Sequence, residues 1–161
     1  MLLLCSCNTT IKSKTPTADN AAGALEPLGY DFVIFDSDGD GVKDDIAALA
    51  CLGMSGGYGS FRLEVFVSGE NGYRKVFASE QYEMDELTYQ RLCEDVGGEL
   101  MIDTIYSAAS SDVDGDGCDE LVCRQYAWQE SHSNHIGDVV SVLKVSDIGV
   151  EIVNVRFESQ K

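Results

Sequence analysis

The sequence contains two acidic stretches of the same form, DSDGDGVKDDI (Asp36–Ile46) and DVDGDGCDELV (Asp112–Val122). Each places aspartates at alternate positions, with glycines where a sharp backbone turn must be accommodated. The residues on both sides of each stretch have the apolar character of β-strands. The sequence therefore predicts two tight acidic loops, each lying between two strands.

The spacing of the acidic residues is typical of a site for a hard cation. Oxygens at positions 1, 3, 5 and 9 of such a loop, with a backbone carbonyl at position 7, can surround one ion. Without an ion the crowded carboxylates would repel one another. Oxygen ligands on a flexible loop favour calcium over zinc, copper or magnesium. We therefore expect two Ca²⁺ sites, with the ligands Asp36, Asp38, Asp40, Val42 (carbonyl) and Asp44 in the first and Asp112, Asp114, Asp116, Cys118 (carbonyl) and Glu120 in the second.

The first loop is one residue longer than the second before its apolar strand begins. Asp44 and Asp45 therefore compete for the last ligand position. An EF-hand would need a glutamate at position 12, where Ala47 and Cys123 stand instead. The sequence thus predicts calcium loops outside the EF-hand fold.

Both loops resemble those of FG-GAP and VCBS-type repeats, which occur in integrin α-subunit propellers and in many exported bacterial proteins. The likeness covers most of residues 31–157, although only the loops are specific. It implies a loop between two strands that binds calcium through the residues named above. The first loop alone also has a weaker likeness to dockerin and thrombospondin type 3 calcium repeats.

Alternating apolar residues predict a β-hairpin after each acidic loop, and a helix between the two halves. Residues 84–96 have helical spacing, with Asp85 as the N-cap and Gly97 as the stop. The expected hairpin strands are 61–67 with 73–78 and 139–145 with 150–157.

We therefore expect one mainly β domain at 28–161, made of two duplicated hairpin units (about 28–80 and 100–158) and one amphipathic helix between them (about 84–96). Two units cannot close a ring of about 4 to 8 blades, so a closed monomeric propeller is excluded. The units can form one antiparallel sheet, a pair of sheets with the helix packed against them, or half of an assembly that a second chain completes.

The N-terminal residues resemble a bacterial lipoprotein signal. Leu4, Cys5, Ser6 and Cys7 match a lipobox, which implies lipidation of Cys7 after a truncated signal peptide at 1–6. Residues 7–27 are rich in small and polar side chains and predict a flexible tether. The expected location is extracytoplasmic, with the lipid anchor as the only membrane contact.

Composition restricts the partners further. The chain has 28 acidic and 11 basic residues and a formal charge of −17, which disfavours nucleic acid and anionic lipids. Four cysteines lie beyond the lipobox: Cys51, Cys93, Cys118 and Cys123. They can form two disulfides or remain free thiols, and none of them forms a CxxC motif.

The usual catalytic motifs are absent from the sequence, so we expect a protein that is not an enzyme. His132 and His135 are expected in a solvated loop. The leading hypothesis is a calcium-stabilised module of the cell envelope, acting as a scaffold or in surface interactions. The alternatives are a glycan- or protein-recognition module using Trp128 and Tyr126, and a hydrolase based on carboxylates.

Overall fold

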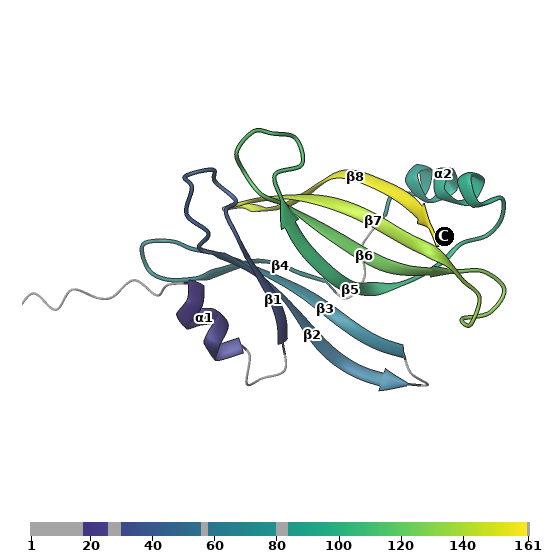
Figure 1. The fold of residues 1–161 in the computed structure, drawn as a ribbon, viewed down its shortest axis with the longest axis horizontal. Helices are drawn as coiled ribbons and strands as arrows, with labels where there is room; N and C mark the ends of the chain where they lie inside the picture. Colours follow the sequence, from purple (N-terminus) through teal and green to yellow (C-terminus); the bar gives the residue numbers. More distant parts are fainter. Residues whose placement is uncertain (1–17, 26–29, 56–57, 80–83, 161) are drawn as a thin grey trace, which may run out of the picture.

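A computed structural model describes residues 18–25, 30–55, 58–79 and 84–160 (Figure 1). The expected signal peptide and the lipidation site at Cys7 lie outside these residues. Eight strands and two helices follow along the described chain as α1 (Ala18–Leu25), β1 (Tyr30–Phe35), β2 (Asp45–Ser55), β3 (Tyr58–Val67), β4 (Arg74–Ser79), α2 (Glu86–Val96), β5 (Met101–Ser111), β6 (Glu120–Trp128), β7 (His135–Ser146) and β8 (Gly149–Ser159).

The strands form two four-stranded antiparallel sheets, in the orders β1-β2-β3-β4 and β5-β6-β7-β8. Every strand pairs with its neighbour in the sequence, so each sheet is a simple meander (Figure 1). An acidic loop connects the first two strands of each sheet. The mainly β fold class is thus confirmed, and of the expected arrangements the chain adopts the pair of sheets.

The main core lies between the two sheets. Strand β3 supplies Leu63 and Val65, both fully buried, at the alternate positions that the sequence pattern indicated. They belong to the same apolar cluster as Leu121 of β6 and Leu143 of β7. The inner faces of the sheets therefore hold the two halves of the chain together.

Helix α2 covers the rest of the inner face of the second sheet. Val139, Leu143 and Val145 share one face of β7, because side chains alternate along a strand. Leu143 and Val145 pack against the first sheet, whereas Val139 packs with the buried Leu92 of α2. The first sheet and α2 thus divide this face between them.

The boundaries of α2 agree with the expectation from the sequence. The Asp85 carboxylate accepts a hydrogen bond from the Thr88 backbone nitrogen (3.0 Å) and caps the N-terminus. Gly97 ends the helix in the left-handed conformation, and its amide donates to the Glu94 carbonyl (3.2 Å).

Helix α1 was not anticipated, because it lies inside the segment expected to be a flexible tether. Ala18 of α1 is buried with Ile46 and Ala48, which occupy the outer face of β2. Eight residues of modest helix propensity would not form a stable helix alone, so this contact with the sheet stabilises it. Regular secondary structure among the described residues therefore begins before the first strand.

Cys51, Cys93, Cys118 and Cys123 are all free thiols. Of the two alternatives left open by the sequence, the structure has the thiols and not the disulfides.

Neither described helix is long and apolar enough to cross a membrane.

Truncation of Leu143 tests the core between the sheets. Because this side chain is 1% exposed, Leu143→Ala should lower the free energy of unfolding by about 2 to 5 kcal/mol in urea denaturation. Ile148 is 89% exposed, and Ile148→Ala should change it by less than about 0.5 kcal/mol. An equal decrease in the free energy of unfolding of the two variants would contradict the placement of Leu143 in the core between the sheets.

Candidate functional site

The two acidic loops lie side by side although they belong to different sheets (Figure 1). The amide of Asp119 donates to the carbonyl oxygen of Asp36 (2.6 Å), and the amide of Asp36 donates to the Asp119 carboxylate (3.2 Å). Lys43 of the first loop adds an ion pair with the same carboxylate (2.7 Å). The loops therefore form one continuous acidic region.

Each loop is organised by the carboxylate of its first aspartate. The Asp36 carboxylate accepts hydrogen bonds from the amides of Gly39 and Gly41, both at 2.8 Å. The Asp112 carboxylate accepts the corresponding bonds from Gly115 (2.7 Å) and Gly117 (3.2 Å). The last glycine of each pair has a positive φ, 85° in the first loop and 94° in the second, which explains the residue type at that turn.

The next two aspartates also bond to the loop backbone in the same way in both loops. Asp38 accepts from the Asp40 amide (3.1 Å), and Asp40 accepts from the Val42 amide (2.7 Å). In the second loop Asp114 accepts from the Asp116 amide (3.0 Å), and Asp116 accepts from the Cys118 amide (2.9 Å). Two segments far apart in the sequence thus have the same local conformation.

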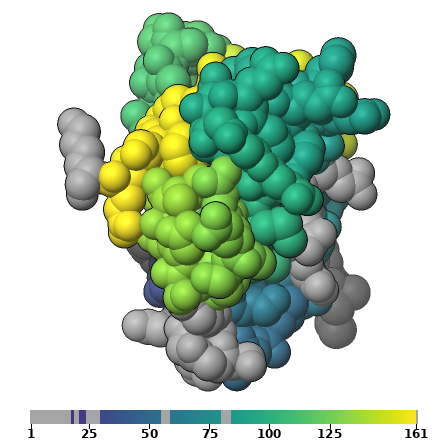
Figure 2. All heavy atoms as spheres, turned by 90° about the vertical axis from the view of Figure 1, so that its right-hand side faces the viewer, coloured from purple at the N-terminus to yellow at the C-terminus, as the bar shows by residue number. Residues whose placement is uncertain are grey.

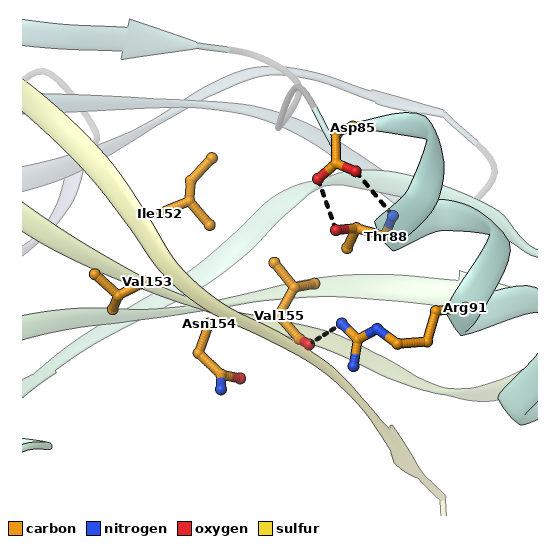
Figure 3. Close-up of a pocket in the computed structure, with 7 residues that line it drawn as sticks. All are labelled: Asp85, Thr88, Arg91, Ile152, Val153, Asn154 and Val155. Carbon is orange, nitrogen blue, oxygen red and sulfur yellow. Dashed lines mark hydrogen bonds between the residues drawn. The ribbon is translucent and has the colours of Figure 1, made fainter.

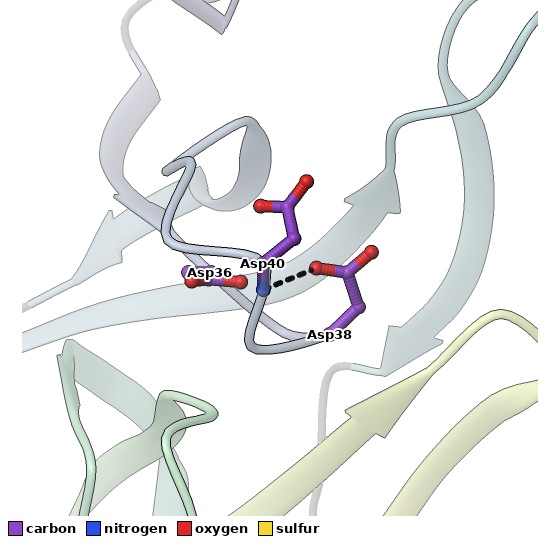
Figure 4. A group of neighbouring side chains, drawn as sticks. All are labelled: Asp36, Asp38 and Asp40. Carbon is purple, nitrogen blue, oxygen red and sulfur yellow. Dashed lines mark hydrogen bonds between the residues drawn. The ribbon is translucent and has the colours of Figure 1, made fainter.

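This conformation gathers the alternating aspartates around each bend. In each loop, one carboxylate oxygen from each of the three aspartates lies within 4.8 Å of the other two. Figure 4 shows the first group, with Asp38 turned toward the backbone nitrogen of Asp40. Six of the predicted ligands therefore come together as two groups that can hold a metal ion: Asp36, Asp38 and Asp40, and Asp112, Asp114 and Asp116.

The last predicted ligand position differs between the loops. The Asp44 carboxylate accepts a hydrogen bond from the Ser68 hydroxyl (2.7 Å), away from the first group of aspartates. Its neighbour Asp45 accepts from the amide of Ser37, the second residue of the loop (3.2 Å). Glu120 accepts the equivalent bond from Val113 (2.8 Å). Asp45, not Asp44, is therefore the structural counterpart of Glu120.

Neither Asp44 nor Glu120 belongs to the groups of mutually close oxygens found among the described residues. The backbone carbonyls of Val42 and Cys118 remain predicted ligands.

A lysine from β7 enters the second loop. The Lys144 ammonium contacts the Asp116 carboxylate and lies 3.6 Å from an oxygen of Asp114 and 3.8 Å from Oε1 of Glu120. That Glu120 oxygen is buried and has no hydrogen-bond partner among the described residues. Sequence reasoning missed Lys144, because only the pairing of β6 with β7 brings it to the loop.

The titration of the aspartates reflects these different surroundings. Burial acts to raise the pKa of Asp36, but hydrogen bonds from Gly41 and Gly39 outweigh it and hold the pKa below its usual value. The bond from the Asp40 amide acts to lower the pKa of Asp38, yet burial and the neighbouring carboxylates raise it overall. In the second loop the Lys144 ammonium lowers the pKa of Asp116 to about 2.

Aromatic side chains gather beside the turn between β6 and β7. This turn lies on the right-hand side of Figure 1, which faces the viewer in Figure 2. The Tyr126 ring stacks on His135 (3.9 Å between centroids) and on His132 (5.2 Å). Trp128 meets His132 edge-on and donates from Nε1 to the Asp103 carboxylate (3.1 Å), which also contacts His132. Both histidines are partly buried, in contrast to the solvated loop expected from the polar sequence.

A cavity of about 370 Å³ lies beside this cluster, between β2 and β3 of the first sheet and β5 and β6 of the second. The amide of Phe61 donates to the Thr104 hydroxyl (3.1 Å) and links the sheets there. The lining residues are Met54, Gly59, Phe61, Asp103, Thr104, Tyr106 and Tyr126.

A second depression of about 330 Å³ lies between α2 and β8 (Figure 3). Arg91 reaches across it and donates to the carbonyl oxygen of Val155 (2.7 Å). The Asp85 carboxylate turns away to cap α2 through Thr88. The polar groups along this depression thus serve the attachment of the helix.

The chain matches no protein-family model, no curated protein and no solved structure. The description of the site therefore depends on its own geometry: two contacting loops with the same hydrogen-bond pattern, each gathering three carboxylates.

Tyr106 gives the cavity wall a pH dependence that can be measured. Burial, and next its hydrogen bond to the Asp138 carboxylate, raise the pKa of Tyr106 from 10.0 to about 12. The protonated phenol therefore favours the folded state. Its contribution is complete below pH 10 and is lost as the pH rises toward 12. Between pH 10 and pH 12, the free energy of unfolding measured in urea should fall less for Tyr106→Phe than for the natural protein. Equal decreases in the two proteins would contradict the raised pKa of Tyr106.

Proposed function

We propose that this protein is a non-catalytic calcium-binding module, in which each acidic loop takes up one Ca²⁺. The observation that carries the proposal is the identical hydrogen-bond pattern of the two loops, which gathers three aspartate carboxylates in each. Calcium takes about 6 to 8 oxygen ligands in flexible geometry, so the Val42 and Cys118 carbonyls and water would complete the shells.

The ions have a structural role in this proposal. The loops join the two sheets through the hydrogen bonds between Asp36 and Asp119, at a place where negative charge is concentrated. A divalent ion in each loop would reduce the repulsion across this junction and stabilise the docked sheets. The module would thereby act as a rigid scaffold or an interaction surface.

The likeness to FG-GAP and VCBS-type repeats is consistent with this role. Each sheet is a four-stranded meander, the form of a propeller blade, with its acidic loop between the first two strands. We propose on this basis that the halves are two copies of one repeat. Lipidation at Cys7 would place the module outside the cytoplasm, where calcium sites commonly have Kd values of about 10⁻⁴ to 10⁻³ M.

Calcium should stabilise the fold measurably. At these affinities, about 1 mM calcium should add about 0.4 to 1.4 kcal/mol per site and raise the Tm in a thermal melt. Asp38→Asn should remove the part of this stabilisation that comes from the first loop, because it deletes one of the three gathered carboxylates.

Asp95→Asn is the matched control, since it removes the same charge from an exposed position on α2. Its response to calcium should equal that of the natural protein. A Tm that does not change during calcium titration of any of these proteins would contradict the proposal.

Recognition of a glycan is a second candidate, favoured by the cavity beside the aromatic cluster. Phe61, Tyr106 and Tyr126 give this cavity ring surfaces on which a sugar can stack, and Asp103 supplies a hydrogen-bonding carboxylate. Trp128 supports the carboxylate through its indole nitrogen. A carboxylate-based hydrolase has less support, because the groups of close carboxylates found among the described residues lie in the two loops.

A glycan array tests this second candidate. Tyr126→Ala should weaken the binding of any glycan that the natural protein binds by at least about tenfold, because a sugar ring needs an aromatic face on which to stack. Tyr126→Phe keeps the ring and should retain most of the binding. Failure of the natural protein to bind any glycan would exclude this function and leave the calcium module unaffected.

A further inference from the structure

We propose that Lys144 acts as a built-in cation of the second loop, so that calcium fills the first loop first and enters the second only by displacing the lysine ammonium. This inference rests on the proposed calcium function and makes the two sites unequal. It goes beyond the sequence pattern, in which the loops look equivalent.

The position of the ammonium group is the first observation. Lys144 Nζ contacts the Asp116 carboxylate and has Asp114 and Glu120 oxygens at 3.6 and 3.8 Å. Asp114 and Asp116 are two of the three aspartates gathered in that loop. The lysine thus already supplies positive charge to the carboxylates that a metal ion would use.

The burial of the Glu120 carboxylate is the second observation. Its side chain is 2% exposed, and Oε2 is fixed by the Val113 amide. Oε1 has no hydrogen-bond partner in the described part of the chain, with Lys144 as the neighbouring cation. A buried carboxylate oxygen without a donor is costly, so this one points to a cation in the loop.

In the described part of the chain, no cation pairs with the aspartates of the first loop. Asp36, Asp38 and Asp40 form no ion pair with any described residue. The lysine nearest in sequence, Lys43, pairs instead with Asp119 of the other loop. Calcium therefore meets carboxylates that no described ammonium or guanidinium group pairs with in the first loop, and carboxylates already paired with a lysine in the second.

Competition between the two cations follows from electrostatics. An ammonium group and a divalent ion repel each other at the distance set by shared carboxylate ligands, so both cannot occupy the loop in full contact. The Lys144 side chain is 36% exposed and can turn out into water when calcium enters. Its departure would leave Glu120 Oε1 free to approach the ion, directly or through a water.

Amide resonances of the natural full chain can report each loop separately. The Gly41 and Gly117 amides both donate to the first aspartate of their loop, so calcium uptake should shift both in ¹⁵N-¹H correlation spectra. Gly41 should shift at a calcium concentration on the order of tenfold lower than Gly117, given the repulsion between the two cations. Shifts of both at the same concentration would overturn the inference without affecting the proposed function.

Lys144→Gln should bring the two titrations together by strengthening the second site about tenfold, since it removes the competing charge. Arg156→Gln is the matched control: it removes one positive charge from β8, where Arg156 pairs with Glu158. It should leave the order of filling unchanged. An equal effect of both variants on Gly117 would also overturn the inference, because only general charge would then matter.

Isothermal calorimetry separates failure of the inference from failure of the proposed function. If the natural chain and Lys144→Gln both absorb two calcium ions with the same affinities, only the role of Lys144 is wrong. If neither takes up calcium and neither amide shifts, the calcium function itself is wrong and the inference fails with it.

Discussion

The repulsion between carboxylates where the two acidic loops meet is the constraint on which the rest of this molecule depends. Apolar side chains pack the inner faces of the two sheets against each other. At one end of the molecule, polar contacts between Asp36 and Asp119 set the position of one sheet relative to the other. Backbone amides, Lys43 and Lys144 offset part of the negative charge. In a chain with a formal charge of −17, this compensation lowers the electrostatic cost of docking the two loops.

The two loops compensate their charge differently. In the first loop the compensation comes from amides of the loop itself, and the pKa of Asp38 stays raised by its neighbours. In the second loop a lysine from another strand adds a full charge, and the pKa of Asp116 falls to about 2. Similar sequences therefore produce sites with different electrostatic environments, because the strands beside them differ.

Local patterns in the sequence were sufficient for much of the fold. Alternation located β3, β4, β7 and β8, capping residues located α2, and the Asp-Gly spacing located both loops. These signals depend on neighbours in the chain. Helix α1 was missed because its stability comes from Ile46 and Ala48 on β2, a contact that its own residues do not reveal.

The same distinction applies to the candidate site. The six gathered aspartates follow from alternate spacing within each loop, whereas Asp45 and Lys144 could not be assigned from spacing. The extra residue of the first loop moves Asp44 toward Ser68 and brings Asp45 to the place that Glu120 takes in the second. Lys144 depends on the register of β6 with β7, which pairs Leu121 with Leu143. Such non-local details need the three-dimensional structure.

The meander topology also has a consequence for the order of folding. Because every strand within a sheet pairs with its neighbours in the sequence, each sheet can assemble from contacts with a small loop-closure entropy. The bond between Asp36 and Asp119 spans 83 residues and can form only when the two sheets meet. The barrier to this late encounter includes bringing like charges together, so the ionic composition of the solution should govern the rate of the final assembly step as well as the stability of its product.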